Sequence, residues 1–208
     1  MNSDSLKAGD AEDVAGYSSK EGRVKFKFAK NANANFQVRI MQGKYHVFFA
    51  AQNPQKEAKG AKVQDGKASL AGETDSFAKQ AEVENIRSSV IYENLFQGTD
   101  VEYITSGSSL KENIIVKEPQ DSYEYVFEIK TNHVEIQQES DGSISLRKED
   151  SKELLYRIPK MYMWDAEGKE SDAITVQFET KNKKSTLTIQ ADAEWINAED
   201  RVLPVQID

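Results

Sequence analysis

The pattern of apolar and polar positions predicts a chain built mainly from short β-strands. Two early segments place an apolar residue at every second position: Val24, Phe26 and Phe28, then Phe36, Val38 and Ile40. Because successive side chains of a strand point to opposite faces, this period of two indicates strands with one buried face. The step Gln42-Gly43-Lys44 then predicts a turn into a strand over residues 45–50, which gives an early hairpin.

The alternation is clearest in the second half of the chain. The stretch from Val90 to Val116 combines alternating apolar residues with a Gly98-Thr99-Asp100 step, which indicates paired strands and a turn. Tyr123, Tyr125, Phe127 and Ile129 share one face of a further strand. More strands are expected within residues 134–136, 144–146, 154–158, 161–164, 174–178, 186–189 and 202–207.

Two turn and strand details follow from special residues. Asp141-Gly142 between alternating runs predicts a two-residue type I′ hairpin turn, in which both central residues have positive φ. Pro204 has no backbone N–H to donate, so the last strand is expected at a sheet edge.

About a dozen short strands separated by Gly, Asn and Asp turns predict an all-β fold. We expect an antiparallel β-sandwich or two stacked sheets of supersandwich type, with helix confined to short turns. Residues 1–22 are polar and charged and are expected to form a disordered or weakly ordered lead-in. Residues 23–208 are expected to form a single domain, with a boundary near residues 80–88 left open. Residues 53–76 indicate a long loop with one short strand at 68–70, and residues 75–84 a short helix.

Composition narrows the function. The 208 residues carry a net charge of −8, which argues against nucleic-acid partners and anionic membranes because no basic patch is evident. No run approaches the roughly 18 apolar residues of a membrane helix, so membrane insertion is not expected. The chain has no cysteine, which excludes disulfides and thiolate metal sites. The first 22 residues also lack the apolar core of a signal peptide.

The candidate catalytic groups are weak. Asp100, Glu102 and Glu112 fall on neighbouring strands and offer a carboxylate pair of the kind that glycosidases use, but strands carry such acids routinely, so turn and salt-bridge roles are the favoured interpretation. Asp100 is expected to cap a turn. The two histidines, His46 and His133, lie far apart in sequence, so we expect no catalytic, cofactor or metal site.

The sequence leaves two further ligand sites open. The acidic turn at Asp165 to Gly168 leaves a calcium ion open, although its ligand spacing is incomplete. Tyr162 and Trp164 share one face of a strand, and such rings either fill a core or form an exposed binding platform.

Several motifs together resemble a known module. The first runs from Tyr92 through Asn94, Gly98, Asp100 and Tyr103 to Leu110-Lys111-Glu112; the second is Trp195-Ile196 followed by Arg201, Pro204 and Asp208. Over about residues 88–208 this arrangement is similar to a β-rich module of bacterial wall-associated, RHS (YD)-repeat, teneurin-like and DNRLRE-domain-containing surface proteins. The chain departs from that pattern at Ser109-Leu110, where the family favours Gly-Val or Gly-Leu.

The resemblance implies a non-enzymatic structural or interaction module of a large secreted bacterial surface or toxin-delivery protein. Its motif residues would be Asp100, Lys111, Glu112, Arg201, Pro204 and Asp208. It also implies an extracellular or cell-wall location and contacts with neighbouring domains of the same polypeptide. The alternative is a carbohydrate-binding module that binds cell-wall or host glycans on Tyr162 and Trp164.

Overall fold

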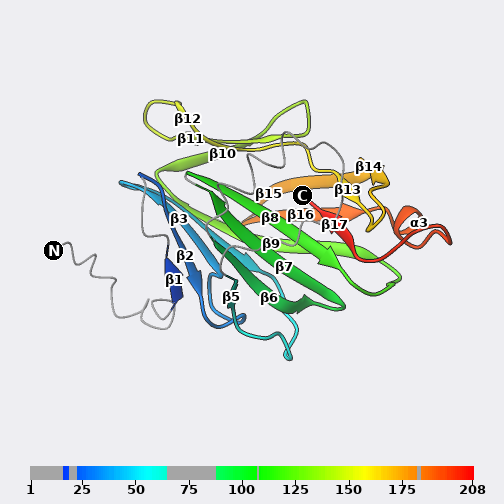
Figure 1. The fold of residues 1–208 in the computed structure, drawn as a ribbon. Coiled ribbons are helices and arrows are strands. Elements are labelled where there is room, and N and C mark those ends of the chain that lie inside the picture. The colour runs from blue at the N-terminus through cyan, green and yellow to red at the C-terminus, as the bar shows by residue number, and fades with distance from the viewer. Residues whose placement is uncertain (1–15, 19–22, 65–87, 107, 182–183) are drawn as a thin grey trace.

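The computed structural model describes residues 16–18, 23–64, 88–106, 108–181 and 184–208. In this part of the chain two seven-stranded antiparallel sheets, here called sheets A and B, pack face to face, and a three-stranded sheet, sheet C, lies at one end (Figure 1). The predicted all-β antiparallel sandwich is therefore confirmed. Its one described helix is α3, Ala193–Ile196.

Sheet A joins the early hairpin to strands from the end of the chain. Its strands, in spatial order, are β1 (Gly16–Ser18), β2 (Lys25–Ala29), β3 (Val38–Gln42), β4 (Tyr45–Ala51), β9 (Tyr123–Asn132), β16 (Lys184–Ala191) and β15 (Ile174–Lys181). The alternation over 123–129 arises because Tyr123, Tyr125, Phe127 and Ile129 are all buried on the inner face of β9.

Sheet B is built around the paired strands predicted over residues 90–116. Its strands, in spatial order, are β14 (Glu170–Ser171), β13 (Met163–Trp164), β17 (Val205–Ile207), β8 (Ser109–Val116), β7 (Thr99–Ser106), β6 (Ser88–Phe96) and β5 (Lys62–Gln64). The three-residue strand β5 was not predicted, because a run so short shows no periodicity.

Aromatic side chains from both sheets fill the space between them. The rings of Phe28 and Tyr103 have centroids 5.9 Å apart, and those of Phe96 and Tyr125 are 5.1 Å apart. The hydroxyl of buried Tyr92 on sheet B donates a hydrogen bond to the backbone oxygen of Ala29 on sheet A at 2.7 Å. Ring packing and this hydrogen bond together hold the two layers at a fixed distance.

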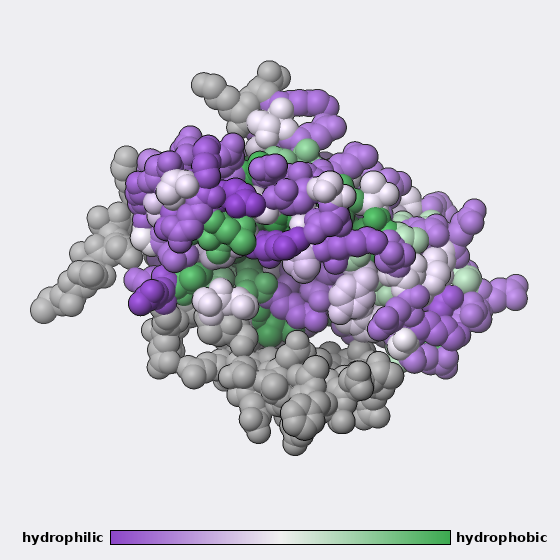
Figure 2. Space-filling view, turned by 90° about the horizontal axis from the view of Figure 1, so that it is seen from above, coloured by the Kyte–Doolittle hydropathy of each residue, from purple (hydrophilic) through white to green (hydrophobic). Residues whose placement is uncertain are grey.

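Sheet C covers the end of the sandwich shown at the top of Figure 1. It consists of β10 (Val134–Gln138), β11 (Ile144–Lys148) and β12 (Leu154–Ile158), and its apolar side chains Val134, Ile144 and Leu146 are buried. Asp150 beyond β11 accepts a hydrogen bond from Lys44 Nζ at 2.8 Å, which ties sheet C to the β3–β4 turn. Seen from above that end, the surface is largely hydrophilic with a few apolar side chains between the charged ones (Figure 2).

The edge strand β15 receives a side chain from sheet C. The amide nitrogen of Gln138 donates to the backbone oxygen of Val176 at 2.8 Å, and its amide oxygen accepts from the backbone N–H of Phe178 at 3.4 Å. One side chain thus satisfies both backbone groups that a neighbouring strand would use at this point.

Two local predictions are wrong. The β10–β11 hairpin has a three-residue turn, because Glu139 pairs with Ser143 and only Gly142 of the intervening residues has positive φ, +84°. Asp141 keeps ordinary φ, and its side chain accepts a hydrogen bond from the Ser143 backbone at 3.0 Å. The last strand, β17, lies between β13 and β8, not at an edge; Pro204 precedes its first paired residue and therefore removes no ladder hydrogen bond.

Some predictions fall outside the described residues. These are the strand at 68–70, the helix at 75–84 and most of the lead-in at 1–22. Within that lead-in, Gly16–Ser18 forms β1 and pairs with β2. The lead-in and the boundary near 80–88 stay predictions.

Candidate functional site

Lys111 and Glu112 lie on opposite faces of β8, as their adjacent positions predict. Lys111 points to the outer face and its Nζ atom lies 3.0 Å from Asp208. Glu112 points inward, where it accepts a hydrogen bond from the Tyr103 hydroxyl at 2.8 Å. Burial raises the pKa of the Glu112 carboxyl to about 7, with a smaller upward contribution from Asp208, while the Tyr103 hydrogen bond opposes the rise.

Asp100 supports the backbone of its own sheet. Its Oδ1 atom accepts a hydrogen bond from the Asn94 backbone at 2.7 Å and lies 2.6 Å from Lys117 Nζ. Asn94 has a φ of +52° and sits where the β6–β7 register shifts, so the carboxylate satisfies a backbone N–H that the ladder leaves without a partner. Asp100 was expected to cap a turn; its side chain instead accepts the backbone N–H of Asn94 at a β-bulge.

The three candidate acids do not form a pair across one cleft. Asp100 and Glu102 alternate with buried Val101 and face the outside of sheet B, whereas Glu112 faces the core. Glu102 Oε2 lies 3.3 Å from the Asn113 amide nitrogen. Groups on opposite faces of a sheet cannot act on one glycosidic bond, so the geometry does not support a pair formed by Asp100 and Glu112.

The residues after α3 converge on Asp165. The Arg201 guanidinium lies 3.2 Å from Asp165 Oδ2 and stacks on Trp195. Asp165 Oδ1 accepts backbone hydrogen bonds from Glu167 at 3.0 Å and Lys169 at 2.9 Å. Burial opposes ionisation of Asp165, but these backbone bonds and Arg201 outweigh it and lower the pKa of the carboxyl. Both carboxylate oxygens of Asp165 are therefore already occupied by donors of the chain.

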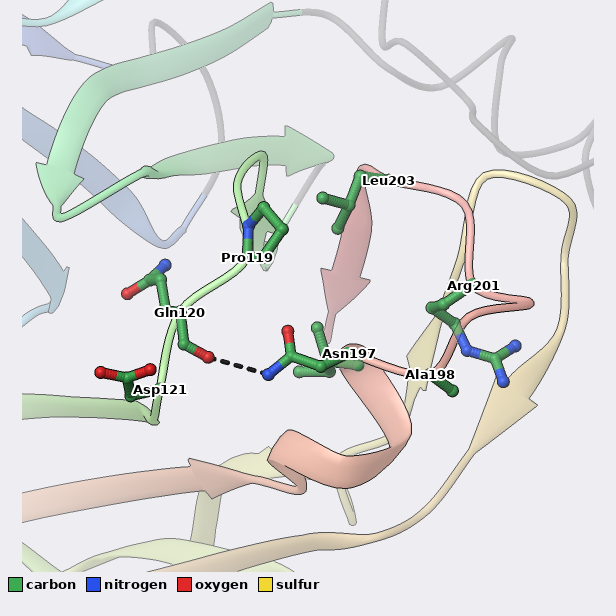
Figure 3. Close-up of a pocket in the computed structure, with 8 residues that line it drawn as sticks. Pro119, Gln120, Asp121, Asn197, Ala198, Arg201 and Leu203 are labelled. Carbon is green, nitrogen blue, oxygen red and sulfur yellow. Dashed lines mark hydrogen bonds between the residues drawn. The ribbon is translucent and has the colours of Figure 1, made fainter.

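A shallow pocket of about 290 Å³ lies between the β8–β9 loop and the segment after α3 (Figure 3). Its walls are formed by Pro119, Gln120, Asp121, Ile196, Asn197, Ala198, Arg201 and Leu203. The Asn197 amide nitrogen donates to the Gln120 backbone oxygen at 2.8 Å, and its oxygen accepts from the Tyr123 hydroxyl at 2.6 Å. The polar groups of the pocket thus join two chain segments, and the Arg201 guanidinium points away from Gln120 and Asp121 (Figure 3).

Tyr162 and Trp164 form the stacked pair that their spacing allowed. The ring centroids are 5.1 Å apart with an interplanar angle of 29°, and Tyr162 is 41% exposed. Lys111 Nζ lies 5.4 Å from the Trp164 ring centre. The other tyrosines of sheet B, Tyr92 and Tyr103, are buried in the core.

A basic and aromatic surface lies on the outer face of sheet A, which the sequence did not predict. Register places four residues in one row across neighbouring strands: Lys27 on β2, Arg39 on β3, Phe48 on β4 and Lys130 on β9. We call this row, together with Lys25, Phe36 and His46, the basic face; within it the Arg39 side chain is buried, with 5% of its surface exposed. The Phe36 and Phe48 rings have centroids 5.2 Å apart, and Lys130 Nζ lies 4.7 Å from the Phe36 ring centre.

Two features are absent from the described residues. No group of three or more His, Asp or Glu side chains is placed to hold a metal ion there. No helix in the same part of the chain is long and apolar enough to span a membrane.

A family model described as a domain of unknown function, DUF7948, matches residues 9–197. Curated relatives include the tRNA3(Ser)-specific nuclease WapA of Bacillus spizizenii and the tRNA nuclease WapA of Bacillus subtilis strain 168. Each is 27% identical to the chain over an alignment of 189 residues, and the alignment covers 85% of this chain. The chain spans about 8% of the length of these relatives. No solved structure matches it.

These comparisons correct four expectations. The matching family is DUF7948, so the assignment to RHS, teneurin-like and DNRLRE-associated modules is wrong. Relatives named as tRNA nucleases contradict a purely structural, non-enzymatic protein, and they contradict the exclusion of nucleic acid. The comparisons also give no support to the carbohydrate-binding alternative. Net charge sums over the whole chain, so it does not by itself exclude a local basic surface.

Proposed function

We propose, since the chain belongs to the DUF7948 family, that it acts as a tRNA-handling domain of a tRNA nuclease. The observation that carries the proposal is the extent of the similarity to WapA proteins. It covers 85% of the chain and therefore includes strands of both sheets, not one short motif. The activity belongs to the whole polypeptide, of which this chain corresponds to a small part of the length.

The described residues favour substrate binding as the contribution of this domain. Cleavage of an RNA phosphodiester needs a base for the attacking hydroxyl, an acid for the leaving group and a cation near the phosphate. Glu112 has a pKa near neutrality, but it faces the core beside Tyr103. Arg201 is committed to Asp165. The basic face, by contrast, presents lysine side chains and aromatic rings on the outside of a sheet.

The test uses the polypeptide that naturally carries this chain. Purified protein is incubated with total tRNA, and cleavage is followed on denaturing gels at a series of tRNA concentrations. We expect cleavage, and after deletion of this domain a higher KM with little change in kcat. An intact polypeptide that leaves tRNA uncut, or a deletion that leaves KM unchanged, would contradict the proposal.

We also propose that the polypeptide acts outside the cell or in the wall, which is the location that the resemblance to bacterial surface proteins implied. Detection of the domain in secreted and wall fractions of the native host, with a cytosolic marker as control, tests this location. Retention in the cytosolic fraction alone would overturn it.

A further inference from the structure

Lys117, Asn94 and Asp100 bring an amine, a carboxamide and a carboxylate together at one end of strands β6, β7 and β8. Lys117 is the first residue after β8, and its Nζ atom lies 2.9 Å from Asn94 Oδ1 and 2.6 Å from Asp100 Oδ1. The same Asp100 oxygen accepts the Asn94 backbone N–H at 2.7 Å. We call these three side chains the Lys117 triad.

The backbone fixes the two partners of the triad relative to each other. The Lys117 N–H donates a hydrogen bond to the Gly98 backbone oxygen at 2.9 Å, in the turn that joins β6 to β7. Asn94 has a φ of +52° and lies at the β6–β7 bulge, where Asp100 satisfies its N–H. Because both chain segments are held in this way, the amine meets the carboxamide without the entropy cost of bringing two free groups together.

The partners of Lys117 differ from those of ordinary surface lysines. Lys44 pairs with Asp150 and Lys160 with Asp172, so each of these nitrogens meets a carboxylate. A carboxylate resists attack by an amine, because its negative charge repels the electron pair of the nitrogen. A carboxamide carries no such charge and can release ammonia. Lys117 therefore meets both a group that its neutral amine can attack and a carboxylate that can carry protons.

We propose that Lys117 and Asn94 form an isopeptide cross-link and that Asp100 moves the protons. The Asp100 carboxylate takes a proton from the Lys117 ammonium, and the electron pair of the neutral Nζ attacks Asn94 Cγ. The new N–C bond forms, the Cγ–Nδ2 bond breaks, and Asp100 returns its proton to Nδ2. Ammonia leaves, and the second proton released by Nζ passes to it in water to give ammonium.

This reaction needs no oxidant, metal or cofactor, because the three side chains supply every atom and proton. The chain has no cysteine and so cannot form a disulfide. The isopeptide bond would join β6 to the segment after β8 and enclose β7 in a covalent loop. A covalent loop restricts the unfolded chain in the same way as a disulfide does. The cross-link is independent of tRNA and goes beyond the proposed function.

The first test is the intact mass of the 208-residue chain. The protein is measured by mass spectrometry directly after purification and again after prolonged incubation at neutral pH. We expect a mass lower than that of the sequence by one ammonia molecule. After digestion with trypsin, the peptides that contain Asn94 and Lys117 should appear as one branched species, because trypsin does not cleave after an acylated lysine.

The second test uses variants of the triad. Lys117→Arg keeps the positive charge, but a guanidinium does not lose its proton in proteins, so the loss of ammonia should disappear. Asp100→Asn keeps an acceptor for the Asn94 N–H but cannot carry a proton between the groups, and it should also stop the reaction. Lys59→Arg is the matched control, because Lys59 pairs with Glu93 beside Asn94 and should leave the mass loss unchanged. Thermal melts confirm that each variant is folded.

The variants also separate the cross-link from a second reaction of asparagine. Closure of a succinimide at Asn94 releases the same ammonia but needs no lysine. A mass loss that persists in folded Lys117→Arg would therefore overturn the inference. The full mass of the sequence in the unaltered chain at both times would overturn it as well, and so would a branched peptide that joins Lys117 to a residue other than Asn94.

Discussion

The guanidinium carbon of Arg201 lies 4.0 Å from the centre of the Trp195 ring. The ring belongs to α3, and the arginine comes after that helix, so the contact folds the last segment back over the helix. The same guanidinium pairs with Asp165 on the turn after β13, where the Arg201 and Asp165 side chains are 8% and 0% exposed. One arginine thus links three segments that meet at the end of sheet B.

Removing the Arg201 side chain should therefore destabilise the domain. Arg201→Ala leaves Asp165 charged and buried, and loss of one partner of a buried ion pair costs about 3 kcal/mol or more. Urea unfolding should show the loss as a lower midpoint. Arg157→Ala is the control, because its pair with Asp141 is more than half exposed and should cost less than about 1 kcal/mol. Equal midpoints for both variants would remove the linking role of Arg201.

The carboxyl of Glu112 should make stability depend on pH. Its pKa rises from 4.5 in the unfolded chain to about 7 in the folded one, so the folded state holds a proton that the unfolded state releases. The contribution is fully present below pH 4.5 and is lost as pH rises through 7. We expect a fall on the order of 1–3 kcal/mol in the free energy of unfolding, reduced by the partial exposure of the side chain.

Glu112→Gln provides the comparison for this pH effect. The amide mimics the protonated acid and does not titrate, so the variant should lose most of the pH dependence between 4.5 and 7. Chemical unfolding of both proteins at a series of pH values measures it. Parallel curves would show that Glu112 is not the titrating group.

Gly142 should tolerate few replacements. Its φ of +84° disfavours residues with a Cβ, although a Cβ there would meet only Lys160 Cγ at an ordinary 3.7 Å. The cost is therefore one of backbone conformation, about 1 kcal/mol or more for Gly142→Val. Gly142→Asn should lose less, since Asn adopts positive φ more readily. Identical melting temperatures for the two variants would contradict this reading of the turn.

Asp100 should matter through its contact with Asn94. Asp100→Ala removes the acceptor of a backbone N–H at the bulge and should cost about 1–2 kcal/mol. Asp100→Asn keeps a side-chain oxygen and should cost less. Asp121→Ala, an exposed acid on the pocket rim, should stay within about 0.5 kcal/mol of the parent chain. A larger effect of Asp121→Ala than of Asp100→Ala in thermal unfolding would count against the bulge contact.

Strand alternation was sufficient to predict the sandwich, because each strand has one buried face. Tyr123 and Phe127 illustrate this, since their spacing alone indicated the inner side of β9. Pro204 led to the wrong prediction of an edge strand. Proline lacks only its own backbone N–H, and the paired part of β17 starts one residue later, at Val205. Asp141-Gly142 misled because a three-residue turn needs only one residue with positive φ.

The basic face could not be predicted in the same way. Lys27 and Lys130 are distant in sequence and share a surface only because β3 and β4 lie between β2 and β9. Which strands lie side by side is decided by the tertiary fold. The periodicity within one strand shows which of its faces is buried but not which strands are its neighbours. The link to tRNA likewise comes from relatives and not from any motif in the residues.

The Gln138 amide that occupies the edge of β15 has a consequence for solubility. An uncovered edge strand is a template on which a second copy can add a strand. The Gln138 side chain forms hydrogen bonds with the backbone oxygen of Val176 and the backbone N–H of Phe178. A strand from another molecule would have to break these two hydrogen bonds before it could pair with β15 there. A single glutamine from the capping sheet thereby protects the domain from aggregation through this edge.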